Sequence, residues 1–223
     1  MRTIIIGLGG IGSDLADKIC RFLNYKNGHY EVLMIDGDEY EEKNLERQSF
    51  LGFGKKSEAK FKELSKKYMN LNLNYSTNFI NDDNIKNFIT DGDIVLLCVD
   101  NHKTRKLVND YVTKLNNISL ISGGNELTDG NVQIYLRKEG KKLTPSLTDY
   151  HPEIEEADDK RPDEMSCEEL HNVEPQLLFT NITASTIMCW SYYNVIQGNE
   201  VPSEMYFDIL KMAVDPKIRK VKN

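Results

Sequence analysis

The chain has 223 residues, a formal net charge of −7, and 39% hydrophobic residues. This length is enough for one domain with a substantial core, and the composition is that of an ordinary globular protein. The negative charge argues against a nucleic-acid partner held by general electrostatics. No apolar stretch approaches the length of a membrane span, so we expect no membrane partner either.

Met1 leads directly into a short apolar run, Thr3–Ile6, and then into glycines. This is not the pattern of a signal peptide, so we expect a cytoplasmic protein. The four cysteines are widely separated and form no C-x-x-C pair: Cys20, Cys98, Cys167 and Cys189. They predict free thiols and no zinc site.

In chain order, short apolar runs alternate with segments of helical periodicity. Strands are predicted at residues 3–7, 31–36, 93–99, 117–122 and 132–136, with a weaker one at 74–80. Helices are predicted at residues 11–24, 57–68 and 102–115. Continuous apolar strands that alternate with helices predict an α/β fold, with a doubly wound, mostly parallel sheet and helices on both faces.

The second half of the chain has a different pattern. Residues 149–169 are crowded with carboxylates and contain two prolines, which predicts an irregular acidic crossover segment. A solvated loop without a role is an equally good interpretation. A long helix is predicted at residues 176–196, followed by a break at 194–202, a short amphipathic piece and a basic tail with Lys217, Arg219, Lys220 and Lys222.

The first strand and helix are joined by a G-x-G-x-x-G turn formed by Gly7, Gly9 and Gly12, with Gly10 inside it. Such a turn lets a phosphate approach the backbone at the positive end of a helix. Asp36 ends the second strand, where an acid accepts hydrogen bonds from ribose hydroxyls. The turn suits NAD, FAD or ATP, and the alternative is a glycine turn that binds nothing.

Three further runs occur in order: Asp36-Gly37-Asp38-Glu39-Tyr40-Glu41-Glu42-Lys43-Asn44-Leu45-Glu46-Arg47-Gln48, then Asp100-Asn101-His102-Lys103-Thr104-Arg105, then Ser122-Gly123-Gly124 with Gly130. The first is similar to the D-x-D-x(5)-N-L-x-R-Q signature of the ThiF/MoeB family of adenylating domains, and the second to its D-N-x-x-x-R pattern. The resemblance implies a single adenylation domain over residues 1–223. Residues 1–136 would be its nucleotide-binding core, and residues 137–223 its crossover segment, long helix and tail.

The resemblance also implies the ligands, ATP and Mg²⁺. Arg47 and Asn44 would contact the phosphates, Asp100 would be the metal-linked aspartate, and Asp36 would bind the ribose. Asp38, Gln48 and Asn101 would complete the nucleotide site. The family's lysine lies 13 residues after the signature arginine, which is Lys60 here, and Lys56 is its competitor.

Each of these residues also has a structural interpretation. Arg47 could be a surface salt-bridge partner, and Lys60 one charge on a solvated helix face. Asp100-Asn101 could be a plain helix N-cap, which is compatible with a metal role.

The chain departs from the family pattern before its first strand, and the structural zinc that family members hold with two C-x-x-C pairs is also missing. Family members often carry an arginine before the first strand, and Arg2 is too close to that strand to serve as one. Cys167 is the candidate reactive thiol, in a P-x-S-C-like stretch that continues into Gln176 and Asn181. Flanking carboxylates would raise the pKa of its thiol, so an ordinary thiol is the better interpretation.

The implied function is ATP-dependent activation of the C-terminal carboxylate of a small ubiquitin-like or sulfur-carrier protein, by an enzyme that commonly pairs as a homodimer. One alternative is an NAD-dependent oxidoreductase, although hydride transfer does not require Arg47 or Asp100-Asn101. A second is a catalytically silent relative that serves as a scaffold.

Overall fold

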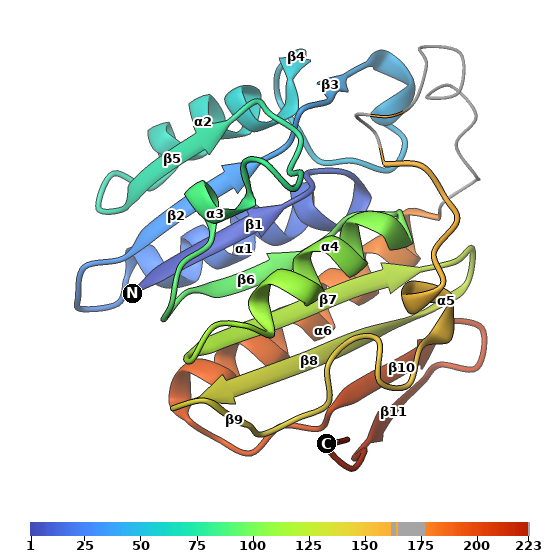
Figure 1. Cartoon of the computed structure of the whole chain (residues 1–223). Helices are drawn as coiled ribbons and strands as arrows, with labels where there is room; N and C mark the ends of the chain where they lie inside the picture. The colour runs from blue at the N-terminus through green and yellow to red at the C-terminus, as the bar shows by residue number, and fades with distance from the viewer. Residues whose placement is uncertain (162–163, 165–176, 223) are drawn as a thin grey trace.

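The computed structural model describes residues 1–161, 164 and 177–222 (Figure 1). Within these residues, nine strands form one sheet in the order β11-β10-β8-β7-β6-β1-β2-β5, with β9 paired to β8. The strands are β1 (Arg2–Ile6), β2 (Glu31–Ile35), β5 (Asn72–Ser76), β6 (Ile94–Leu97), β7 (Ile118–Asn125), β8 (Asp129–Lys138), β9 (Lys141–Lys142), β10 (Glu204–Asp208) and β11 (Ala213–Lys217). A separate small hairpin joins β3 (Glu39–Tyr40) to β4 (Gly54–Lys55).

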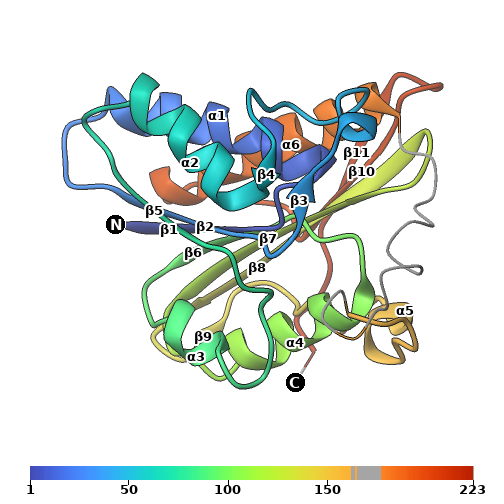
Figure 2. The ribbon, with the colours of Figure 1, turned by 90° about the horizontal axis from the view of Figure 1, so that it is seen from above.

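The helices are α1 (Gly10–Asn24), α2 (Lys56–Lys67), α3 (Ile85–Phe88), α4 (His102–Val112), α5 (Pro152–Glu155) and α6 (Leu178–Gln197), and η1 (Glu42–Asn44) is a short 3₁₀ turn. Seen from above, α1, α2 and α6 cover one face of the sheet, and α3, α4 and α5 cover the other (Figure 2). The predicted α/β fold with helices on both faces is therefore confirmed.

The parallel part of the sheet runs from β5 through β2, β1 and β6 to β7. The chain first builds outward from β1 to β2 and β5, and then returns to place β6 on the other side of β1. The strand order therefore reverses between β1 and β6. Ligands of open α/β sheets bind at the carboxyl ends of the strands at such a reversal, and the glycine turn follows β1 at this position.

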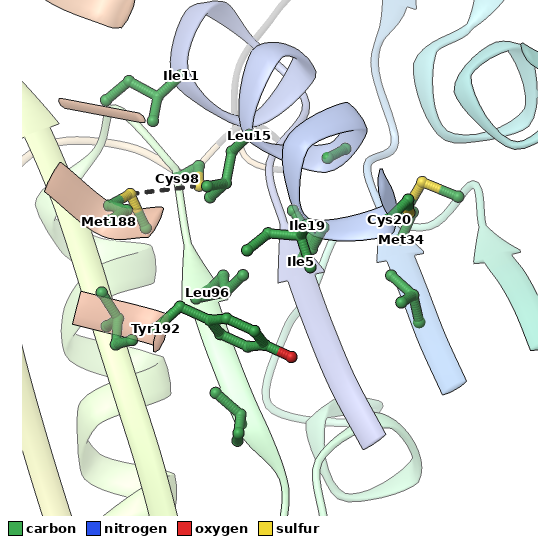
Figure 3. Close-up of a cluster of buried hydrophobic side chains, with 14 of the residues drawn as sticks. Ile5, Ile11, Leu15, Ile19, Cys20, Met34, Leu96, Cys98, Met188 and Tyr192 are labelled. Atoms are coloured by element: carbon green, nitrogen blue, oxygen red, sulfur yellow. Dashed lines mark hydrogen bonds between the residues drawn. The ribbon is translucent and has the colours of Figure 1, made fainter. Parts of the chain in front are cut away.

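The core beneath α1 and α6 is made of aliphatic, aromatic and sulfur-containing side chains (Figure 3). Met188 and Tyr192 of α6 enter this core beside Leu15 of α1 and Leu96 of β6. The Tyr192 hydroxyl also lies 2.8 Å from that of Thr3 in β1. The last long helix of the chain therefore completes the packing around its first strand.

The C-terminal region differs from the prediction of a short amphipathic piece and a basic tail. β10 pairs antiparallel with β8, and β11 pairs antiparallel with β10, so Lys217 lies in a strand. β11 contains Pro216 and is the last strand in the sheet order. Proline cannot donate a ladder hydrogen bond and is tolerated at a sheet edge, so the residues of this strand carry only a weak strand signal.

α6 begins at Leu178 and ends before Gly198, whose positive φ of 70° closes the helix in the left-handed conformation. These bounds agree closely with the predicted helix, although Gln176 lies outside the described residues. Over the part of the chain that the structure describes, no helix is both long and apolar enough to cross a lipid bilayer.

Candidate active site

The glycine turn has the geometry of a phosphate-binding loop. Gly7 has a φ of +87°, and a Cβ there would lie 2.9 Å from the carbonyl oxygen of Cys98 in the neighbouring chain segment. A Cβ on Gly12 would overlap the carbonyl oxygen of Gly7. By contrast, a Cβ on Gly9 would meet nothing within 4 Å. The turn is therefore closed where strand and helix pack together and open above Gly9.

The N-terminus of α1 lies at this opening. Gly9 is its N-cap, no side chain among the described residues caps it, and its first turn has no acidic residue. The first N–H groups of a helix lack intrahelical partners and carry partial positive charge. The end of α1 can therefore receive an anion at the open side of the turn.

Asp36 braces the turn from the end of β2. Its carboxylate accepts hydrogen bonds from the backbone N–H of Leu8 (2.5 Å) and from that of Asp38 (2.8 Å). Burial raises the pKa of Asp36, and the charge of nearby Lys56 acts in the opposite direction. Each carboxylate oxygen has a second lone pair, so Asp36 can still accept hydrogen bonds from hydroxyl groups of a ligand.

The two candidate lysines of α2 occupy different environments. Lys56 lies at the start of α2, where its ammonium contacts the Asp38 carboxylate at 2.5 Å. Burial tends to raise the pKa of Asp38, but the charge of Lys56 prevails and holds that pKa below its ordinary value. Lys60 has a fully buried side chain that contacts the backbone carbonyl of Ser49 and pairs with Glu63 at 3.0 Å. These contacts favour Lys56, the competitor in the sequence analysis, as the lysine beside the two aspartates.

The loop that carries Arg47 is fixed against the first turn of α1. The Asn44 side chain accepts a hydrogen bond from the N–H of Glu41 (2.9 Å) and organises the η1 turn. The Ser13 hydroxyl accepts a hydrogen bond from the N–H of Ser49 (3.1 Å). Between these two anchors, Arg47 Nε and Gln48 Oε1 are buried and have no hydrogen-bond partner among the described residues.

The start of α4 brings Asp100 and Asn101 to the same edge of the sheet. Asn101 is the N-cap, and its side chain accepts a hydrogen bond from the N–H of Thr104 (2.8 Å). The capping interpretation is therefore confirmed for Asn101, while its buried Nδ2 has no partner among the described residues. Asp100 is exposed next to it. β6, which precedes this pair, lies beside β1, which precedes the glycine turn.

Asp159 contacts the start of α4, which the sequence did not predict. Its carboxylate accepts hydrogen bonds from the N–H groups of His102 (2.6 Å) and Lys103 (2.9 Å) at the start of α4. A carboxylate is favoured at a helix N-terminus. Only the density of acids in the crossover segment hinted at such a role, and it could not say which acid would reach α4.

Arg105 holds the neighbouring strand ends together. It is buried and donates to the carbonyl oxygens of Val99 (2.6 Å) and Gly123 (2.8 Å) and to the Ser122 hydroxyl (2.9 Å). Burial lowers the pKa of its guanidinium. Arg105, the arginine of the D-N-x-x-x-R pattern, therefore bonds to protein atoms and stabilises the strand ends next to the candidate site.

Arg2 lies at the other end of β1. Its guanidinium pairs with Asp93 at 2.6 Å and donates to the carbonyl oxygen of Phe88. Its hydrogen bonds hold it at the amino ends of β1 and β6, away from the glycine turn.

The described cysteines are poor nucleophiles. Burial raises the pKa of Cys20 and of Cys98 to about 12, and that of Cys189 to about 11. Cys20 and Cys98 are buried, and all three described cysteines are free thiols, as predicted. Cys167 lies outside the described residues, so its role stays a prediction.

A glycine turn at the strand reversal of a doubly wound sheet, with an acid at the end of β2, defines a Rossmann-type α/β protein. Within that class, the chain belongs to the ThiF family, whose family profile matches residues 1–220.

The chain is similar to two kinds of curated relatives. It is 31% identical over 137 residues to the adenylyltransferase and sulfurtransferase MOCS3 of Drosophila virilis, which covers 60% of this chain and 29% of that protein. It is 29% identical over 145 residues to the adenylyltransferase and sulfurtransferase UBA4 of Meyerozyma guilliermondii, covering 62% of this chain and 32% of that protein. The chain therefore spans about a third of the length of these relatives.

Solved structures share the fold. Escherichia coli MccB crystallised with ATP has a TM-score of 0.75 at 18% identity, over 97% of this chain and 63% of the MccB chain. MccB crystallised with MccA has a TM-score of 0.76 at 18% identity, over 99% of this chain and 64% of MccB.

Proposed function

We propose that this protein is an ATP-dependent adenylyltransferase, which activates the C-terminal carboxylate of a small ubiquitin-like or sulfur-carrier protein as an acyl-adenylate. The proposal is supported by membership of the ThiF family and by the names of the MOCS3 and UBA4 relatives. The fold neighbour MccB has been crystallised with ATP and with MccA. Because such a reaction consumes ATP, we also propose that the protein acts in the cytoplasm.

One observation carries the proposal most directly. Buried polar atoms without partners among the described residues belong to Arg47, Gln48 and Asn101, three of the residues that the family signature nominates. An unpaired buried polar group costs about 1–3 kcal/mol, so native proteins keep few of them. Their presence near an open, uncapped helix N-terminus supports a polar ligand with acceptor oxygens for Arg47 and Asn101 and a donor group, such as a hydroxyl, for Gln48.

The chemistry explains why cations are needed at this place. Activation brings a carboxylate and a triphosphate together, and both are anions. A carboxylate oxygen attacks the α-phosphorus, the bond from that phosphorus to the bridging oxygen breaks, and pyrophosphate leaves with the electron pair. Arg47 offers a planar fork for phosphate oxygens, and Lys56 offers a point charge. Both would stabilise the charge that develops on the leaving group.

Asp36 and Asp38 are suited to different tasks in this scheme. Asp36 is buried, fixed by two backbone N–H groups, and would accept hydrogen bonds from the ribose hydroxyls. Asp38 pairs with Lys56 and would hold that lysine in place before the phosphates arrive. Lys60, which the signature spacing favoured, would instead support the Arg47 loop through the carbonyl of Ser49.

Asp100 fits a magnesium ion that is bound chiefly through the nucleotide. Mg²⁺ commonly takes one or two carboxylates, substrate phosphates and several waters rather than an all-protein cage. Among the described residues, no group of three or more His, Cys, Asp or Glu side chains could form such a cage, whereas Asp100 is an exposed carboxylate at the sheet edge. When bound, the ion would neutralise charge on the phosphates.

We further propose a homodimer that forms through the exposed side of α6. Phe179, Trp190 and Tyr193 are 66%, 52% and 49% exposed. Their spacings of 11 and 14 residues place them on one stripe of the helix, opposite the buried Met188 and Ala184. Aromatic side chains are enriched in protein interfaces.

Pyrophosphate exchange tests the function. The protein is incubated with ATP, Mg²⁺, labelled pyrophosphate and candidate carrier proteins that end in glycine. We expect exchange that requires the carrier's terminal glycine, and loss of at least about 100-fold in Arg47→Ala, which removes a cation beside the leaving group, and in Asp100→Ala, which removes the proposed magnesium ligand. Thermal unfolding of both variants should match the parent protein.

Matched controls are available on the same molecule. Arg21→Ala removes an exposed arginine of α1, and Asp215→Ala an exposed aspartate of β11, and both should retain full exchange. Normal exchange in Arg47→Ala or Asp100→Ala would refute the site. ATP binding without exchange for any carrier would indicate a scaffold, and NADH binding without ATP binding would indicate an oxidoreductase.

A further inference from the structure

The side chain of Asn181 is a buried amide that the proposed site does not yet include. It lies in the first turn of α6 and is 1% exposed. Neither its Nδ2 nor its Oδ1 has a hydrogen-bond partner among the described residues. The adjacent Thr180 is also buried, but its hydroxyl donates to the carbonyl oxygen of Leu127 at 2.7 Å. Within the first turn of α6, the side chain of Asn181 therefore lacks the partners that its neighbour has.

The amide of Asn181 lies directly against the glycine turn. A Cβ on Gly10 would overlap the Asn181 amide and would lie 2.8 Å from its Oδ1. Gly10 is the first residue of α1 and follows Gly9, above which the turn is open. The first turn of α6 therefore places a neutral donor and acceptor beside the N–H groups that begin α1.

An asparagine at this position has an energetic consequence. Leucine, which has nearly the same shape, would fill the space between the two helices without burying unpaired polar atoms, whose desolvation opposes folding. The unpaired amide thus weakens the protein while its ligand is absent. A ligand with polar atoms at the glycine turn would supply the missing hydrogen bond.

We propose that Asn181 is a nucleotide-positioning residue, whose Nδ2 donates a hydrogen bond to a phosphate oxygen of the nucleotide bound at the glycine turn. The donor is the relevant atom because the N-terminus of α1 attracts an anion, and phosphate oxygens only accept hydrogen bonds at neutral pH. The identity of the nucleotide rests on the proposed function. Because Asn181 is neutral, it adds a directional contact without competing with Lys56 for charge.

The test is ATP titration of the full chain by calorimetry in the presence of Mg²⁺, together with thermal unfolding of the free protein. We expect Asn181→Ala to raise the Kd for ATP by about 10- to 100-fold, the effect of one hydrogen bond to a charged acceptor. Its melting temperature without ATP should be equal to that of the parent protein or higher, because two unpaired polar atoms are removed. A merely structural asparagine would give the opposite pattern, with lower stability and unchanged affinity.

Two further variants sharpen the result. Asn194→Ala is the matched control, because Asn194 lies on the same helix but bonds to the carbonyl oxygen of Trp190, and both its affinity and its stability should equal those of the parent protein. Asn181→Asp preserves the shape of the side chain and places an anion beside the phosphates. It should weaken ATP binding more than Asn181→Ala does.

An unchanged Kd in either Asn181 variant overturns the proposal, and so does failure of the parent protein to bind ATP. If Asn181→Ala does not fold, the Kd for ATP of Asn181→Asp, measured by the same titration, tests the proposal. The experiments distinguish failure of the proposed adenylyltransferase function from failure of the positioning role of Asn181. ATP binding that depends on Asn181 without pyrophosphate exchange would remove the proposed function alone, whereas exchange with an unchanged Kd in the variants would remove only the positioning role.

Discussion

Lys56 and Lys60 lie one helical turn apart on α2, yet their surroundings indicate different roles. The ammonium of Lys56 is beside Asp38, whose side chain is 47% exposed at the edge of the candidate site. Lys60 is enclosed and meets a carboxylate that is itself 6% exposed. Burial lowers the pKa of Lys60, and its pairing with Glu63 opposes that shift.

Replacing each lysine by alanine should affect the Kd for ATP and the free energy of unfolding to different extents. Lys56→Ala should raise the Kd for ATP by about 10-fold or more with a smaller loss of stability than Lys60→Ala causes, because its partner Asp38 is half-exposed. Lys60→Ala should lower the free energy of unfolding by about 3–5 kcal/mol, because it breaks a buried ion pair, and should raise the Kd less than Lys56→Ala does. Calorimetric titration and urea unfolding measure both quantities. Weaker ATP binding in Lys60→Ala alone would restore the residue that the signature spacing favours.

The sequence could not show which lysine lies beside the aspartates, because the number of residues between two positions does not determine the conformation of the loop that joins them. The signature interval assumes a loop of standard length between arginine and lysine. Here the pairing of β3 with β4 places Lys55 opposite Glu39, and the N–H of Lys56 bonds to the carbonyl oxygen of Asp38. That pairing of short strands brings Lys56, rather than Lys60, to the aspartates.

At the scale of helices and strands, an element could be predicted where its sequence pattern was strong. The first strand, glycine turn and helix were recognisable, because an apolar β-branched run, three glycines and a helical repeat coincide within residues 3–24. β10 and β11 were not recognised, because their residues mix charges, aromatics and a proline. Their pairing with β8 is a tertiary effect that local propensity does not encode.

One side-chain cluster connects α5 to this antiparallel edge. His151, the N-cap of α5, lies with Nε2 2.6 Å from Glu204 of β10 and Nδ1 2.6 Å from Glu153. Glu204 also accepts a hydrogen bond from Asn131 of β8 and contacts Arg219 at 3.4 Å. Burial lowers the pKa of His151, but its hydrogen bonds to Glu204 and Glu153 prevail and raise it above the ordinary value.

The cluster predicts a specific pH dependence of stability. Because the folded-state pKa of His151 is raised, its contribution is complete below the unfolded pKa of about 6.5 and is lost as the pH rises through the folded value. The pKa of Glu204 is lowered, since His151 outweighs burial, so its contribution is complete above about 4.3 and is lost under stronger acid. Stability from this pair is therefore greatest between these two pH values.

His151→Gln should remove about 1–3 kcal/mol at pH 6 and progressively less as the pH rises above the folded pKa of His151. Urea unfolding at a series of pH values measures the difference. His29→Gln is the matched control, because His29 is exposed, and it should leave the pH profile unchanged. A constant difference between His151→Gln and the parent protein at every pH would contradict the assignment.

At the scale of the whole molecule, the aromatic stripe of α6 predicts the oligomeric state. We expect the parent protein to sediment at twice the 25.7 kDa chain mass at micromolar concentration. Trp190→Glu should shift it to the monomer, because a charge at the centre of an apolar interface is left desolvated and unpaired. Leu210→Glu changes an apolar residue beyond β10 that is even more exposed than Trp190, and this variant should remain dimeric. A monomeric parent protein would contradict the proposed pairing.

The position of α6 has one more consequence, which concerns how this fold can be divided. Met188 and Tyr192 pack against the first helix and strand of the chain, and Asn181 lies against Gly10. Residues 1–136 therefore do not hold a complete hydrophobic interior, although they contain the recognisable motifs. A recombination event or an engineered chimera that exchanged only this motif-bearing part would separate it from the helix that seals it. The smallest transferable unit must carry both ends of the chain.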